Sequence, residues 1–179
     1  RVLFRSQICP RPIAIRKFEP CPFVFRIACQ QSFALDHADS NIGVTRIMRY
    51  AFALAQARPR KLLTVVTKSN AQRHAMVMWD EIAKEVSAEY PDVHWDKELV
   101  DACTARMVNR PATLDTLVAT NLHADILSDL AAALAGSLGI APTGNIDPER
   151  RYPSMFEPIH GSAFDIMGKG LANPIDRKS

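Results

Sequence analysis

The sequence predicts an α/β fold in which helices pack against a sheet, and two observations support this class. Between Gly43 and Leu134, short apolar runs typical of buried strands alternate with longer segments of helical periodicity. The 179-residue chain is also 47% hydrophobic, which is enough for the core of one domain or for parts of two. No internal repeat is present in the sequence.

The first expected element is a helix that begins near Gly43. Its apolar residues follow the i, i+3, i+4 spacing of an amphipathic helix. They are Ile47, Tyr50, Ala51, Leu54 and Ala55. The helix is expected to stop at Arg58, because the residue before a proline, here Pro59, disfavours the α conformation.

Strands and helices then alternate along the chain. Residues 61–66 have the composition of a short buried strand. The elements expected after it are helix 72–89, strand 93–96, helix 98–109, strand 115–119 and helix 124–134. Residues 136–145 are rich in turn-forming residues and are expected to form a connection without regular structure.

The two ends of the chain have a different texture. Residues 1–40 show no sustained periodicity, and residues 1–6 and 176–179 look like translations of the two orientations of a sequencing adapter. We therefore expect residues 1–42 and 176–179 to be non-native, through adapter sequence or a shifted reading frame. A genuine N-terminal extension is the alternative.

Composition and charge narrow the class of partner. The net charge of +3 is small and its Lys and Arg residues are interspersed with Asp and Glu, so neither nucleic acid nor a membrane surface is expected. No apolar run approaches the roughly 20 residues of a membrane helix, and a cytoplasmic location is expected. The four cysteines fit no common zinc spacing and are expected to be unpaired thiols. The expected partner is therefore a small-molecule ligand.

Two carboxylates in the last expected helix suggest a metal site. Asp125 and Asp129 are four residues apart, so on a helix they lie about one turn from each other on one face. Two like charges so placed repel unless a cation lies between them, and Mg²⁺ or Mn²⁺ prefers oxygen ligands. The alternative is an ordinary solvated helix face.

A loop near the C-terminus suggests a cofactor site. Residues 156–165 gather Glu157, His160 and Asp165 around Gly161 and Ser162. Such a loop exposes backbone N–H groups, glycine permits close approach of a ligand, and an acidic group suits ribose hydroxyls. A structural turn with a hydrogen-bonded histidine is the alternative.

Lys68 and Asp101 are two further candidate site residues because of where they lie in the sequence. Lys68 directly follows the buried strand 61–66, and loops at the carboxyl ends of strands tend to face ligand crevices in α/β sheets. Asp101 lies near the start of the helix expected at 98–109. Taken alone, each is more typical of a surface residue.

Together these motifs resemble a known family. About three quarters of the chain, from Gly43 to Ile175, resembles the isopropylmalate, isocitrate and tartrate/D-malate dehydrogenases, and most closely the tartrate/D-malate branch. The motifs that carry the resemblance occur in the family's order and are residues 49–52 (RYAF), 67–70 (TKSN), 99–101 (LVD), 121–130 (NLHADILSDL) and 156–173.

The resemblance implies an NAD-dependent, Mg²⁺- or Mn²⁺-dependent decarboxylating dehydrogenase of a 2-hydroxy acid. Asp125 and Asp129 would bind the metal, joined by Asp101 from the other subunit of a homodimer. Lys68, also contributed across the interface, matches the family's acid/base lysine. The dinucleotide-binding residues implied are Glu157, His160, Gly161, Ser162, Ala163, Asp165 and Asn173. Asp165 would favour NAD over NADP.

The implied fold is the family's two-domain α/β subunit, with its N-terminal half missing. Residues 43–135 would form the smaller domain, for dimerisation and for metal and substrate binding, and residues 136–175 the C-terminal part of the cofactor domain. Residues 1–40 match none of the family's upstream substrate-binding arginines or its catalytic tyrosine. The fragment alone is therefore expected to be inactive.

Other functions stay open at this point. The substrate of the full enzyme could be 3-isopropylmalate instead of tartrate or D-malate, since the discriminating residues lie upstream. The chain could also be a non-catalytic dimerising fragment, or a metal-dependent hydrolase that uses the aspartate pair without NAD.

Overall fold

The described part of the chain forms one sheet with helices on both faces. The computed structural model describes residues 2–3, 26–29, 41–136, 141–159 and 161–171. The strands are β1 (Val2–Leu3), β2 (Arg26–Cys29), β3 (Leu62–Thr67), β4 (His94–Leu99), β5 (Thr116–Ala119), β6 (Pro142–Asn145) and β7 (Met155–Pro158). The helices are α1 (Asn41–Gln56), α2 (Ala75–Ser87), α3 (Val100–Asn109) and α4 (Asn121–Leu134), with short 3₁₀ helices η1 (Pro111–Thr113) and η2 (Phe164–Ile166). The predicted α/β class is confirmed.

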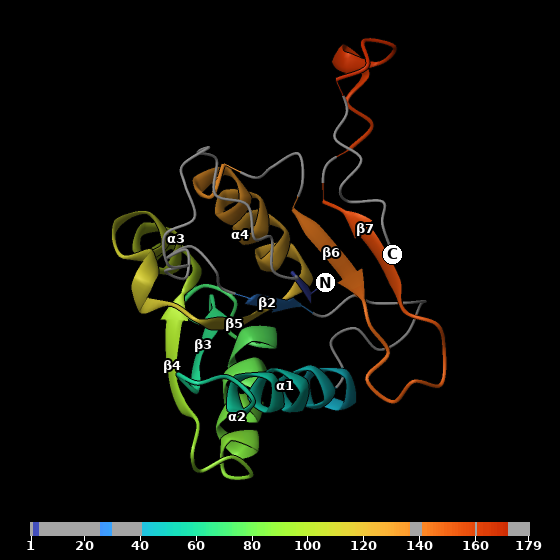
Figure 1. The fold of residues 1–179 in the computed structure, drawn as a ribbon. Helices are drawn as coiled ribbons and strands as arrows, with labels where there is room; N and C mark the ends of the chain where they lie inside the picture. The colour runs from blue at the N-terminus through green and yellow to red at the C-terminus, as the bar shows by residue number, and fades with distance from the viewer. Residues whose placement is uncertain (1, 4–25, 30–40, 137–140, 160, 172–179) are drawn as a thin grey trace.

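The sheet has a parallel half and an antiparallel half. Its strand order is β4-β3-β5-β2-β1-β6-β7 (Figure 1). Strands β4, β3, β5 and β2 are parallel, whereas β1, β6 and β7 pair antiparallel. Because parallel neighbours end at the same edge, the residues that follow β3, β4 and β5 lie close together there.

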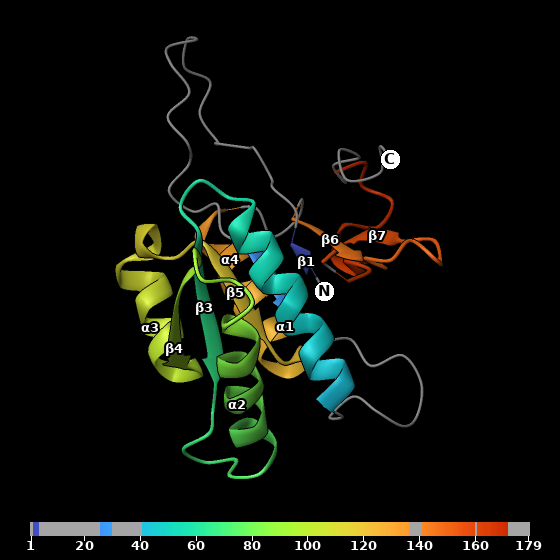
Figure 2. The same ribbon diagram turned by 90° about the horizontal axis from the view of Figure 1, so that it is seen from below.

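Each face of the parallel half has its own core. On one face α1 and α2 pack over Val65 and Val118, and on the other α3 and α4 pack over Val66 and Leu117. Figure 1 shows α1 and α2 below the parallel strands and α3 and α4 above them, and Figure 2 views the molecule from the side of α1 and α2. Successive strand residues point to opposite faces, so strands buried on both faces read as continuous apolar runs.

Helix α1 is present where predicted, but its buried face is shifted from the predicted stripe: of that stripe only Ala51 and Ala55 are buried, and Ile47 and Tyr50 are half-buried against the same core. Its buried residues are Val44, Met48, Ala51, Phe52 and Ala55. Phe52 stacks on Tyr90 with ring centroids 5.5 Å apart and meets Trp95 edge-on at 6.1 Å. The helix ends at Gln56, two residues before the predicted stop, and the chain turns through Lys61, whose φ is 47°.

The other predicted helices and strands are present with shifted ends. Strand β4 runs on to Leu99, so α3 begins at Val100 and not near residue 98. Helix α4 begins at Asn121, three residues earlier than predicted. Such shifts are usual, because helix ends fray and depend on local capping.

Four strands lie where no strand was predicted, and one of them, β7, includes the start of the segment 156–165 that was expected to be a loop. Strands β1 and β2 fall in the aperiodic opening stretch, and β6 falls in residues 136–145, which were expected to lack regular structure. The β6 sequence, Pro-Thr-Gly-Asn, consists mainly of turn formers, yet Val2 pairs with Gly144 and Asn145 pairs with Met155. Pairing on both sides therefore overrides the local preference of these residues.

None of the described helices is both long and apolar enough to cross a membrane. The described residues from 161 to 171 project from the rest of the chain beyond β7 (Figure 1).

Candidate active site

Lys68 and Asp101 meet at the carboxyl edge of the parallel strands. Thr67 and Leu99 are register partners at the ends of β3 and β4. Lys68 directly follows the first strand and Asp101 lies just after the second, so the sheet brings them together. The Lys68 Nζ donates a hydrogen bond to Asp101 Oδ1. The Lys68 side chain is 27% exposed and that of Asp101 is 65% exposed.

This contact gives Asp101 a fixed charge. The hydrogen bond from Lys68 lowers the pKa of the Asp101 carboxyl below its ordinary value. Asp101 is therefore an ionised carboxylate that faces solvent, which is the state a divalent cation requires of an oxygen ligand. The sequence offered both residues as candidates but did not indicate that they pair within one chain.

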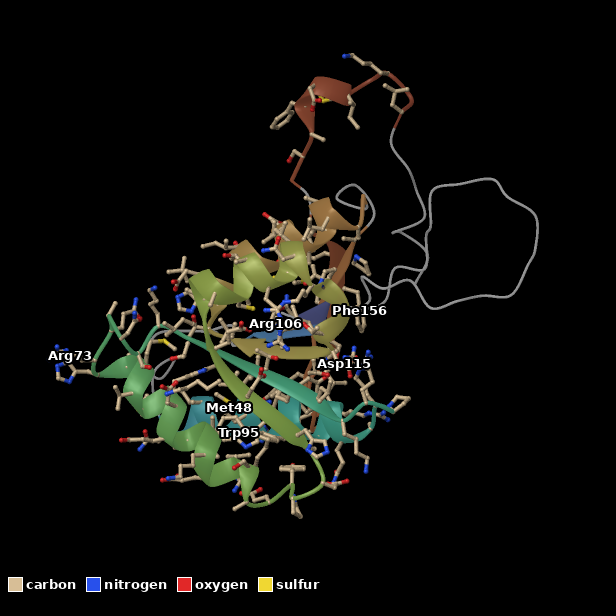
Figure 3. All side chains as sticks on the ribbon, turned by 90° about the vertical axis from the view of Figure 1, so that its left-hand side faces the viewer. Met48, Arg73, Trp95, Arg106, Asp115 and Phe156 are labelled. Carbon is tan, nitrogen blue, oxygen red and sulfur yellow. The ribbon has the colours of Figure 1, made fainter. Side chains whose placement is uncertain are left out.

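Arg106 fixes the helix that carries Asp101. Its Nη1 donates to Asp96 at 2.8 Å and to Glu98 at 3.0 Å, both on β4. Its Nε donates to Thr113 Oγ1 at 2.9 Å. Arg106 thus ties α3 to the preceding strand and to η1, and Figure 3 shows it within the body of the fold. The sequence analysis did not single out this residue, because its partners come from two other elements.

Asp125 and Asp129 lie on the exposed side of α4; their spacing predicted a shared face but not its exposure. The buried face of the helix is formed by His123, Ala124, Leu127, Ser128 and Ala132, and both aspartates are exposed. The carboxylates therefore face solvent on neighbouring turns.

One copy of the chain does not complete a metal site within its described part. No group of three or more His, Cys, Asp or Glu side chains that could hold a metal occurs among those residues. Asp101 of the same chain instead pairs with Lys68. The prediction that Asp101 reaches the metal from a second copy remains a prediction.

The residues predicted to bind a dinucleotide lie on and beyond β7. Glu157 is exposed on β7 and pairs in register with Thr143 of β6. Gly161, Ser162, Ala163 and Asp165 are all exposed. His160 and Asn173 were also predicted here, but they lie outside the described residues.

The backbone of residues 161–165 is accessible to solvent. Ala163 has φ 47° and ψ 53° and precedes η2, which carries Asp165. A Cβ added to Gly161 would meet no atom within 4 Å, so open space surrounds its backbone. The segment thus offers an accessible backbone beside an accessible carboxylate, although it projects away from α4 in Figure 1.

His123 is a residue near the site to which the sequence assigned no role. It lies in the first turn of α4 and is only 7% exposed. Burial, and then the charge of Lys68, lowers its pKa below the ordinary value. Its spacing to Leu127 places it on the apolar face of α4, and this was the one sequence signal for its burial.

Known proteins provide an independent comparison. The sequence model of the family described as isocitrate/isopropylmalate dehydrogenase matches residues 28–177. The match begins inside the aperiodic opening stretch. A probable tartrate dehydrogenase/decarboxylase of Agrobacterium vitis is 82% identical over 136 residues, which cover 76% of this chain and 38% of that protein.

Other relatives agree with this comparison. The decarboxylating D-malate dehydrogenase of Escherichia coli is 55% identical over 133 residues, covering 74% of this chain and 37% of that enzyme. The crystal structure of isocitrate dehydrogenase from Methylococcus capsulatus superposes with a TM-score of 0.72 at 44% identity, over 82% of this chain and 41% of that chain. The chain thus spans less than half the length of these relatives.

Proposed function

The chain belongs to the isocitrate/isopropylmalate dehydrogenase family, and from that membership we propose that it is the C-terminal part of an NAD-dependent decarboxylating dehydrogenase. The proposed substrate is a 2-hydroxy dicarboxylic acid such as tartrate or D-malate. The observation that carries the proposal is the 82% identity to a probable tartrate dehydrogenase/decarboxylase, with 55% to a D-malate dehydrogenase. The enzyme would also require Mg²⁺ or Mn²⁺.

Asp125 and Asp129 suit a hard divalent cation. Both are exposed carboxylates one helical turn apart, so a cation bound to them would displace no core residue. A bound Mg²⁺ or Mn²⁺ would lower the pKa of the substrate hydroxyl and stabilise negative charge during decarboxylation. A third carboxylate, Asp101 of a second copy, would complete the protein ligands.

Lys68 is the proposed acid/base. As a neutral amine it would accept the proton of the substrate 2-hydroxyl. NAD, when bound, would supply the acceptor for the hydride. As an ammonium, Lys68 returns a proton or binds a substrate carboxylate. Because Lys68 directly follows β3, its backbone is held by a buried strand, and the hydrogen bond to Asp101 orients its Nζ.

The segment beyond β7 is the proposed NAD-binding loop. The carboxylate of Asp165 would accept hydrogen bonds from ribose hydroxyls, and Gly161 would let the backbone approach the cofactor. The open space around Gly161 and the exposure of Asp165 support this assignment. His160, Asn173 and Glu157 complete the proposed set.

The enzyme is proposed to act as a homodimer with its site shared across the interface. Leu122 and Ile126 are 65% and 54% exposed on α4, on the same helix as the two aspartates. Exposed apolar side chains near a functional group favour an interface. A second copy against α4 would bring its own Lys68 and Asp101 toward Asp125 and Asp129.

A chimera tests the activity directly. The 136 matched residues of the Agrobacterium vitis relative are replaced by the corresponding residues of this chain, and NAD reduction with tartrate and with D-malate is measured. We expect Mn²⁺-dependent activity from the chimera and none from the 179-residue chain alone. A folded chimera that is inactive with both substrates would overturn the proposal.

A variant pair tests the metal assignment in the same chimera. Asp125→Asn combined with Asp129→Asn should abolish Mn²⁺ binding in calorimetry, because two of the anionic ligands are lost. Glu81→Gln provides the control, since Glu81 is an exposed acid on α2, across the sheet. Equal Mn²⁺ affinity in both variants would exclude the aspartate pair as ligands.

A further inference from the structure

The sheet register places His123 at the same edge of the sheet as the proposed catalytic lysine. Strands β3 and β5 are parallel neighbours, with Val65 paired to Val118. Both strands run toward the same edge, where Lys68 follows β3 and α4 follows β5 after a single residue. His123, in the first turn of α4, therefore lies in the structural neighbourhood of Lys68.

One ring nitrogen of His123 lacks a hydrogen-bond partner. Its Nδ1 is buried and has no hydrogen-bond partner within the described part of the chain. A buried polar atom without a partner is destabilising, and such atoms are rare in folded proteins. A neutral imidazole has one ring nitrogen that accepts a hydrogen bond, and the buried, unpaired Nδ1 is placed to serve as that acceptor.

Lys68 needs a second acceptor if Asp101 is to serve a metal. In the described chain the Lys68 ammonium donates to Asp101. A carboxylate that coordinates a divalent cation is a poorer partner for an ammonium, because the two cations repel. Another nearby oxygen, Thr67 Oγ1, is fully buried and already accepts from the Ser69 N–H at 3.2 Å.

We propose that His123 is a positioning residue for Lys68, and that its Nδ1 accepts a hydrogen bond from the Lys68 ammonium when Asp101 leaves that amine. This inference rests on the proposed function, in which Asp101 becomes a metal ligand. The exchange breaks one hydrogen bond and forms another, with no change of covalent bonds. It satisfies the buried Nδ1 and keeps Lys68 at the edge of the sheet.

The 179-residue chain itself can report this exchange by NMR. The Asp101→Asn variant removes the charge that holds Lys68, so the ¹⁵N resonance of His123 Nδ1 should move upfield as it accepts a hydrogen bond. Adding Lys68→Met to that variant should reverse the shift. His94, which is exposed on β4, provides the internal control and should stay unchanged.

The result that would overturn the proposal is an identical His123 Nδ1 resonance with and without Lys68 in the Asp101→Asn background. This outcome does not depend on enzymatic activity. It therefore separates a failure of the His123 inference from a failure of the proposed function.

Kinetics of the chimera separate positioning from a purely structural role. His123→Leu removes the acceptor and should lower kcat about 10- to 100-fold, with little change in KM. This is less than the roughly 10²- to 10⁴-fold contribution of an acid/base group, because Lys68 itself remains. His123→Asn retains an acceptor close to the position of Nδ1 and should recover most of kcat. Matching thermal stabilities would show that both variants fold.

Two outcomes decide this second test. A His123→Leu chimera with the parent's kcat would overturn the positioning role, and so would equal losses in the Leu and Asn variants. An inactive parent chimera would instead overturn the proposed function, and the NMR result would then decide on His123 alone.

Discussion

Asp115 is a charged residue whose role is to hold the fold together. Its side chain is 3% exposed, directly before β5, and it accepts from Arg58 Nε at 2.9 Å through both carboxylate oxygens. Figure 3 labels Asp115 within the folded body. Since β5 begins next to Asp115 and ends near Asn121, this ion pair lies at the opposite end of the strand from Lys68. It therefore belongs to the fold and not to the proposed site.

Removing the arginine should be costly. Arg58→Met leaves the buried Asp115 carboxylate without its charged partner, and we expect a loss of about 3 kcal/mol in the free energy of unfolding. Urea denaturation at pH 7 measures it. Lys61→Met is the matched control, because the pair of Lys61 with Asp92 is exposed on both sides and should contribute little. Equal losses in the two variants would contradict this account.

Burial lowers the reactivity of the Cys103 thiol. Cys103 lies on the buried face of α3, and burial raises the pKa of its thiol from 9.0 to about 12. Because the thiolate is the nucleophile, such a thiol has roughly a thousandfold less reactive form at pH 8 than an ordinary cysteine.

This gives a direct chemical prediction. The variant for this test has Cys9, Cys21 and Cys29 changed to Ser. In the folded chain Cys103 should resist iodoacetamide at pH 8. In about 6–8 M urea, which unfolds the chain, Cys103 should react fully. Mass spectrometry counts the adducts. Rapid labelling of the folded chain would mean that Cys103 is not buried as described.

Among the elements, α1 was the most predictable and also links the first helical layer. Its helical periodicity was legible in the sequence because one face contacts the core, although the buried face centres on Met48 and Phe52, beside the predicted stripe. On its other side, Arg49 binds Glu89, just after α2, with Nη2 2.7 Å from Oε1 and Nε 2.9 Å from Oε2. No local pattern marked this pair, since the two residues belong to different helical segments.

The Arg49 link should depend on pH. The hydrogen bond from Arg49 lowers the pKa of Glu89 below its ordinary value of 4.5. A carboxyl with a lowered folded pKa contributes stability above the unfolded pKa and loses it as the pH falls through the folded one.

Arg49→Met should therefore be less stable than the parent chain at pH 7, and the difference should shrink as the pH falls below about 4. Thermal unfolding followed by circular dichroism over this pH range measures the difference. A gap between the two proteins that is constant from pH 7 to pH 3 would contradict the assignment.

Strands β6 and β7 show the limit of local reasoning at the element scale. Each is four residues long, and β6 is held by pairing with β1 and β7. Its Pro, Gly and Asn residues disfavour strands in isolation. Sequence patterns could not find it, because the stabilising hydrogen bonds come from residues far away along the chain.

At the scale of the whole molecule, the two parts of the sheet are joined by side chains as well as by strands. Arg46 on α1 donates to Asp147 at 3.1 Å and to Glu149 at 2.5 Å, both in the turn between β6 and β7. This contact joins residues 43–135, predicted to form one domain, to residues 136–175, predicted to belong to another. The proposed boundary near residue 135 is thus crossed by ion pairs.

The proposed dimer yields a prediction at this scale. Leu122→Glu combined with Ile126→Glu places charges on the exposed face of α4 and should convert a dimer into monomers, because buried unpaired charges oppose association. Sedimentation velocity on the chimera measures the change. Val77→Glu is the control, since Val77 is a partly exposed apolar residue on α2, across the sheet.

The two sets of outcomes are distinct. A dimeric control beside a monomeric α4 variant would support the shared site. A parent chimera that is itself monomeric, or an α4 variant that remains dimeric, would contradict it.

The sequence by itself determined the fold class, the positions of the four helices and the motifs that identify the family. Each of these depends on periodicity or on residues close together along the chain. Only the tertiary structure decided that Lys68 pairs with Asp101, that His123 lies buried near that lysine, and that a strand forms from turn residues at 142–145. The physical reason is that strand register and long-range hydrogen bonds join distant residues, and no local pattern encodes which of them will meet.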